Sequence, residues 1–274
     1  MSTPADGMTP AQAAERAAAL AEMTANALNT ARTSLGDAAD LTDVVDRRLR
    51  DVEHGVGVLS DQANRVRFAE NQEEAEFPLR TARYAAYDVQ EDLRRAQGGI
   101  DEVRDRLEQS ARSIAAGREF LNELDELPGQ RSEANDQLRY RLAAFDRAVH
   151  GAIAGVERTD WRLRTARENL EPLVNVPGTV HDQGRAAAVI QEAGSDATQA
   201  VDGARGGIRT LREDFEATWS EASNISHDSN ELADALRAGM NPTKPAEQTG
   251  PASSAEDPRR AWSEGRDLSQ GLNL

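Results

Sequence analysis

Apolar residues recur along most of this chain at alternating intervals of three and four positions. A period of 3.5 kept over several heptads keeps these residues on one helix face and winds neighbouring helices into a left-handed supercoil. Isolated helices gain little stability from propensity alone, so each such seam must be buried against another helix. The clearest seam reads Leu79, Ala82, Ala86, Val89, Leu93, Ala96, Ile100, Val103, Leu107, Ser110, Ile114, Gly117, Leu121 and Leu124.

An alanine-rich helix is predicted over 9–35, ahead of the other seams. Thr9 has the N-cap position there, Pro10 the first helical position and Gln12 the third, which together match a capping box. The last seam predicts a helix about 85 Å long, at a rise of 1.5 Å per residue. The further segments that carry the 3-4 spacing are 41–66, 138–170 and 179–236.

Residues that interrupt helices separate these segments. Gly36 predicts a bend or break, and the acidic loop 70–77 is predicted to end at Pro78, the first residue of the next helix. Further interruptions are predicted at Pro128–Gly129, before Pro172 and at 177–179. Because these connections are short, neighbouring helices should be antiparallel. The sequence therefore predicts an all-α fold, an elongated antiparallel coiled-coil-like bundle of four or five long helices.

The two ends of the chain lack this periodicity. Residues 1–8 are predicted to be a disordered N-terminus, ahead of a bundle that occupies 9–237. Segment 238–258 is rich in proline, glycine and serine and predicts a flexible linker. A short C-terminal peptide, 259–274, follows it.

Glycines inside the seams need an explanation, because each costs a helix about 1 kcal/mol relative to alanine. Gly98 and Gly99 lie in the middle of a predicted helix, and Gly117 and Gly194 occupy seam positions themselves. Small residues allow two helix backbones to approach closely, so tight crossing points are the favoured explanation. A hinge within a long helix is the second explanation, and sequence drift without a role is the third.

The composition excludes several classes of partner. The formal net charge is −16, whereas nucleic acids and anionic membrane surfaces require a basic footprint. No stretch approaches the roughly 20 apolar residues of a membrane span. A secretory signal peptide is not visible, so the expected location is cytoplasmic, with secretion lacking a cleavable signal as the alternative.

The sequence offers no candidate catalytic, cofactor-binding or metal-binding residue. The chain has no cysteine, and its four histidines are scattered without ligand spacing. Phosphate-binding loops, dinucleotide fingerprints and nucleophile elbows are absent as motifs. We therefore predict no enzyme activity and no cofactor.

A short motif of one helical family has counterparts in this chain. Small substrates of type VII secretion carry a Tyr-x-x-x-Asp/Glu export signal, which Tyr84–Asp88 and Tyr87–Glu91 resemble. With three tyrosines and 48 acidic residues, such matches arise readily by chance. The Trp-x-Gly turn of that family is missing, since Trp262 is followed by Ser263 and Glu264. The resemblance does not assign the chain to the family.

Aromatic residues are the best candidates for interaction sites. If Leu79 is an a position, Tyr84 falls at f, directly away from the seam, and Tyr140 and Trp161 fall at f in a later helix. Large aromatic residues that face water tend to mark interfaces. The alternative is that further helices of the bundle cover that face.

The C-terminal peptide is a second candidate. Leu268 and Leu272 lie one helical turn apart, and Trp262 precedes them in a locally basic stretch. These three residues are predicted to dock as a short amphipathic helix, either on a partner or on the acidic bundle of the same chain. An ordinary frayed terminus is the alternative.

These observations predict a non-enzymatic coiled-coil scaffold or adaptor that binds a protein partner or self-associates through its helices. The alternative is an exported helical protein, either a type VII-like secretion substrate or the helical carrier region or partner of a toxin system. A helical enzyme or metal carrier forms a third class, which bound metal or cofactor in the purified protein would reveal.

Overall fold

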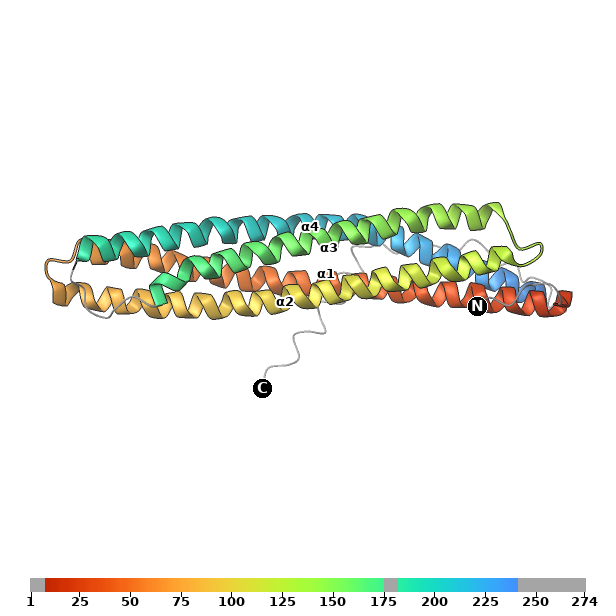
Figure 1. Ribbon diagram of the computed structural model, residues 1–274, viewed down its shortest axis with the longest axis horizontal. Helices are drawn as coiled ribbons and strands as arrows, with labels where there is room; N and C mark the ends of the chain where they lie inside the picture. The colour runs from red at the N-terminus through yellow and green to blue at the C-terminus, as the bar shows by residue number, and fades with distance from the viewer. Residues whose placement is uncertain (1–7, 175–181, 241–274) are drawn as a thin grey trace, which may run out of the picture.

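In a computed structural model, residues 8–174 and 182–240 are described, and they form one long rod (Figure 1). The rod consists of four helices, α1 (Pro10–Arg67), α2 (Gln72–Glu126), α3 (Glu133–Val174) and α4 (Gln183–Met240). Successive helices run in opposite directions, and α4 packs antiparallel against α1 to close the bundle. The predicted elongated antiparallel all-α bundle is confirmed, with four helices in the described ranges.

The first helix is continuous through Gly36, so the predicted division into 9–35 and 41–66 was wrong. The capping box of Thr9 and Gln12 is confirmed. A Cβ atom at residue 36 would lie 2.9 Å from Cζ3 of Trp219 on α4, and the Arg32 guanidinium lies 5.9 Å from the centroid of that indole. Gly36 therefore makes room for an indole ring and does not interrupt the helix.

The connection between α1 and α2 is shorter than predicted. Helix α2 begins at Gln72 and not at Pro78, because Asn71 caps it by accepting a hydrogen bond from the Glu74 backbone N–H at 2.9 Å. Glu73 and Glu74 in the first turn add favourable interactions with the helix dipole. Pro78 is buried inside the helix, so the predicted loop 70–77 is mostly helical.

The turn at Pro128–Gly129 is confirmed, and Gly129 adopts a φ of +77°, a conformation that other residues rarely adopt. Helix α3 continues past Pro172 to Val174, beyond its predicted end. The predicted restart at 177–179 lies outside the described residues. Helix α4 extends past Leu236, the last seam residue, to Met240.

The predicted seams form the core. Every seam residue of 79–124 and of 138–170 is buried, and Ile100, Leu107 and Phe145 are at most 1% exposed. Toward the end of α4, the seam residues Thr218, Leu232 and Leu236 are only partly buried. The 3.5-residue period therefore identified the buried faces of the helices correctly.

Several glycines, Gly99 and Gly207 among them, mark places where helices approach closely. A Cβ atom at residue 99 would lie 2.7 Å from Cγ2 of Val45, and one at residue 207 would lie 2.5 Å from Oγ1 of Thr159. A Cβ atom at Gly98, in contrast, would meet nothing within 4 Å. A Cβ atom at residue 117 would lie 3.1 Å from Cδ2 of Leu28, whereas one at residue 194 would make only an ordinary contact, 3.6 Å from Cβ of Leu59. The close-packing explanation therefore applies to Gly99, Gly117 and Gly207, but not to Gly98.

Arginine side chains link neighbouring helices at the rim of the core. Arg104 on α2 contacts the buried Asp160 carboxylate of α3 at 3.5 Å, and Arg164 contacts the same carboxylate from within α3 at 2.5 Å. Arg141 donates to Glu221 at 2.7 Å, and this hydrogen bond raises the pKa of the guanidinium. The Arg141–Glu221 pair is partly exposed, so its net contribution to stability is small.

Candidate interaction surfaces

The structure places three predicted interaction residues on the outside of the rod. Tyr84, Tyr140 and Trp161 are 67%, 74% and 65% exposed. No helix of the described ranges covers them, so the alternative that the bundle buries this face does not hold for these residues. The other three candidates, Trp262, Leu268 and Leu272, lie outside the described residues.

Tyr140 and Trp161 lie on one outward-facing line of α3. They are separated by three heptads, about 31 Å at 1.5 Å per residue. Val149 and Val156, which lie between them in the sequence, are fully buried on the opposite side of the helix. We call Tyr140 and Trp161 the α3 line. It presents two large rings on a rigid helix, with no rearrangement needed to expose them.

A second aromatic surface lies at the end of the rod where α1 passes into α2 (Figure 1). We define the α1–α2 tip as Phe68, Phe77, Tyr84 and Tyr87, which are 61–78% exposed. Phe68 is the C-cap residue of α1, and its backbone N–H donates to the Asn64 carbonyl at 3.0 Å. The other three residues share one face of α2, because they follow each other at intervals of seven and three positions.

Only Tyr84 of this tip was predicted from the sequence as an interaction residue. Phe68 and Phe77 were missed, because they flank or fall inside the predicted loop 70–77, where helical spacing has no meaning. Tyr87 was noted only for its spacing from Glu91. The signal that could have found the surface is the concentration of four aromatic residues within 68–87 of a chain that is only 4% aromatic.

The tip also carries charged residues on the same face of α2. Glu73 and Glu76 precede Phe77, and Arg80 and Arg83 follow it. The Arg80 guanidinium lies 5.8 Å from the centroid of the Phe77 ring, an arrangement that favours a cation–π interaction. These five residues and Leu79 line a hollow of about 230 Å³.

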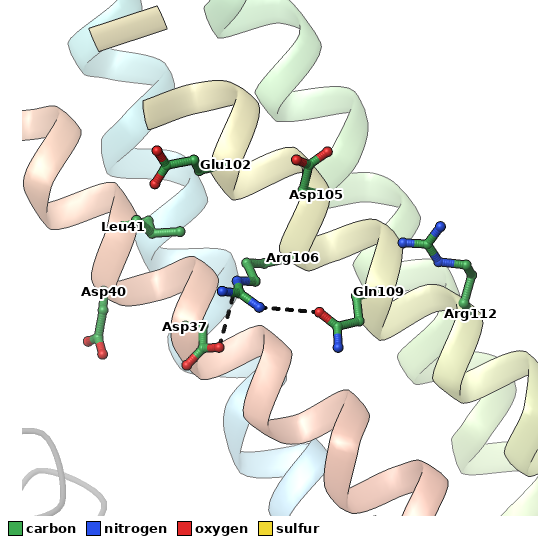
Figure 2. A pocket seen from close by; sticks show the side chains of 8 residues that line it. All are labelled: Asp37, Asp40, Leu41, Glu102, Asp105, Arg106, Gln109 and Arg112. Atoms are coloured by element: carbon green, nitrogen blue, oxygen red, sulfur yellow. Dashed lines mark hydrogen bonds and ion pairs between the residues drawn. The ribbon is translucent and has the colours of Figure 1, made fainter. Parts of the chain in front are cut away.

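A larger groove of about 680 Å³ lies between α1 and α2 near the middle of the rod (Figure 2). Arg106 points from α2 toward α1, with its Nε 3.7 Å from Asp37, and donates to Gln109 at 3.3 Å. The lining residues of the groove are Asp37, Asp40, Leu41, Glu102, Asp105, Arg106, Gln109 and Arg112. Because its central arginine is already bound on both sides, the groove fits an interhelix contact better than a ligand site.

The described residues offer little for metal or proton chemistry. In 8–174 and 182–240, no group of three or more histidine or acidic side chains is placed to hold a metal ion. Beyond the tip on α2, the hydrogen bond from Arg94 lowers the pKa of the Glu91 carboxyl, as expected for an exposed ion pair on a helix. None of the described helices is both long and apolar enough to cross a bilayer.

Comparisons with known proteins do not assign this chain to a family. Neither a protein-family model nor a curated protein matches the sequence. Among solved structures, the chain is similar to the SmhB pore of the tripartite α-pore-forming toxin Smh from Serratia marcescens. The two chains are 13% identical over 84% of this chain and 80% of the other, with a TM-score of 0.26. A likeness at that score supports no argument about function.

Proposed function

We propose that this chain is a non-enzymatic interaction protein, a rigid helical rod that binds a protein partner along the outside of α3. The observation that carries the proposal is the α3 line, where Tyr140 and Trp161 are 74% and 65% exposed. Aromatic side chains contribute nothing to the core in such positions. On a partner's surface, each would contribute about 1.5–3 kcal/mol when fully buried.

The rigidity of the rod favours binding of a partner along α3. Both rings are fixed to one long helix and each has only two side-chain torsions, so little conformational entropy is lost when they are buried. Their separation of about 31 Å suits a partner of domain size or an extended helix laid along the rod. Aromatic residues are also those that most often dominate the energetics of protein interfaces.

Site-specific photo-crosslinking in the source organism tests this proposal. A photoreactive phenylalanine analogue is placed at Tyr140 or at Trp161, and in a control at Asp51. Asp51 is exposed on α1, a helix that packs against α2 and α4 in the described bundle. We expect both α3 probes to give an adduct with the same protein, and the Asp51 probe to give none.

Two results would contradict the proposal. One is the absence of any adduct from either α3 probe, and the other is the same set of adducts from Asp51. A complementary variant, Tyr140→Ser with Trp161→Ser, should lose the partner while its melting temperature changes little, because both side chains are exposed.

A further inference from the structure

We propose that the α1–α2 tip is a dimerisation surface, which pairs with the tip of a second copy of this chain in an antiparallel, two-fold arrangement. The inference goes beyond the proposed function, since it needs no other protein and uses no residue of α3. It is carried by the order of charged and aromatic residues at the beginning of α2.

The charges of the tip are arranged symmetrically with opposite sign about Pro78. Glu76 and Arg80 each lie two positions from this residue, and Glu73 and Arg83 each lie five positions from it. An interface between identical chains related by a two-fold axis must be complementary to itself. If the axis passes near Pro78, Glu76 of one copy faces Arg80 of the other, and Glu73 faces Arg83. A parallel arrangement would instead bring like charges together.

These four side chains are unpaired with one another within a single chain. In the described residues, no ion pair joins Glu73 or Glu76 to Arg80 or Arg83, although the spacing of Glu76 and Arg80 would permit one. Further along α2, Arg94, Arg95 and Arg104 are each paired with a carboxylate on the same helix. The charges of the tip therefore remain available to a second molecule.

The same pairing covers the exposed aromatic rings. With the axis near Pro78, Tyr87 of one copy lies opposite the α1–α2 connection of the other, beside Phe68, and Tyr84 lies opposite the start of α2. Four aromatic side chains of 150–250 Å², each about two-thirds exposed, would bury about 400–650 Å² per copy. A stable interface of standard size buries about 800 Å² per partner, so the four rings would supply most of that buried area.

The arrangement also keeps the acidic bodies of the two molecules apart. The segment that joins α1 to α2 lies at one end of the rod (Figure 1). Because the paired segments would be antiparallel, the two bundles would project in opposite directions. Charges separated by more than a Debye length, about 8–10 Å at physiological salt, are largely screened from each other. A net charge of −16 per chain therefore opposes a side-by-side dimer far more than this end-to-end one.

Charge exchange between two variants of the full-length chain tests the proposal. Sedimentation equilibrium should give the wild-type chain a mass of twice 29.7 kDa at high micromolar concentration. Glu76→Arg alone and Arg80→Glu alone should each weaken dimerisation by about tenfold or more, because each places like charges opposite one another. An equimolar mixture of the two variants should dimerise again, since the facing side chains have opposite charges only when one copy of each variant pairs with the other.

Controls separate this result from a general effect of charge. Arg147→Glu on α3 is an exposed reversal far from the tip and should leave the dimer mass unchanged, and circular dichroism confirms that each variant is folded. A wild-type chain that stays monomeric would overturn the proposal. So would single variants that still dimerise, or a mixture that remains monomeric. None of these outcomes affects the α3 cross-links on which the proposed function depends.

Discussion

Replacement of Leu107 by alanine should lower the free energy of unfolding by about 2–5 kcal/mol, the usual loss when a buried leucine site is emptied. Leu107 is fully buried at the centre of the α2 seam. Its neighbours have little freedom to fill the space, because Ser110, one turn further on, is hydrogen-bonded at 3.0 Å to the Ala31 carbonyl of α1. Urea denaturation followed by far-ultraviolet circular dichroism measures the loss.

The matched control for this prediction is Tyr84→Ala on the same helix. Tyr84 is 67% exposed and faces away from the seam, so its removal should change the free energy of unfolding by about 0.5 kcal/mol or less. The measurement is made at a concentration where the chain is monomeric, so that loss of an interface does not contribute. Equal losses for the two variants would mean that the seam is not the buried face.

Alanine substitution at two adjacent glycines should change the free energy of unfolding in opposite directions. Gly98→Ala should stabilise the chain by about 0.5–1 kcal/mol, because alanine is the better helix former and its methyl group meets nothing within 4 Å. Gly99→Ala should destabilise it by about 1–3 kcal/mol, since the new methyl group would lie 2.7 Å from Cγ2 of Val45 and force α1 and α2 apart.

The same denaturation experiment measures both glycine variants, and each serves as the control for the other. If both substitutions stabilise the chain, α1 and α2 do not approach closely at Gly99, and the close-packing explanation fails. If both destabilise it by similar amounts, the cost comes from the helix itself and not from the neighbouring helix.

The fold was largely predictable because the information is local and periodic. A seam of apolar residues such as Leu93, Ile100 and Leu107 specifies both the helix and its buried face, whichever helix covers it. The role of Gly36 was not predictable in this way. It depends on Trp219, which is remote in the sequence and reaches this glycine only after α1 and α4 have packed together.

For the candidate sites too, the features set by local sequence were predictable and those set by the full helix boundaries were not. The f positions of Tyr84, Tyr140 and Trp161 follow from the heptad register, and their exposure agrees with it. The tip is not predictable from the spacing, because Pro78 is a typical first residue of a helix and here lies inside one. Once Asn71 caps α2, the residues 73–77 join the helical face that continues through 80–84, and the symmetric order of charges becomes visible.

Small-angle X-ray scattering, extrapolated to zero concentration, tests the central claim that residues 8–174 and 182–240 of one chain form a single long rod of four helices. A helix of 58 residues is about 87 Å long, and a rod of that length has a radius of gyration of about 26 Å. A compact globular chain of 274 residues would have a radius of gyration of about 19 Å. We expect a value of about 26 Å or more, with a maximum dimension of at least about 87 Å. A value of about 19 Å with a symmetric distance distribution would contradict the rod.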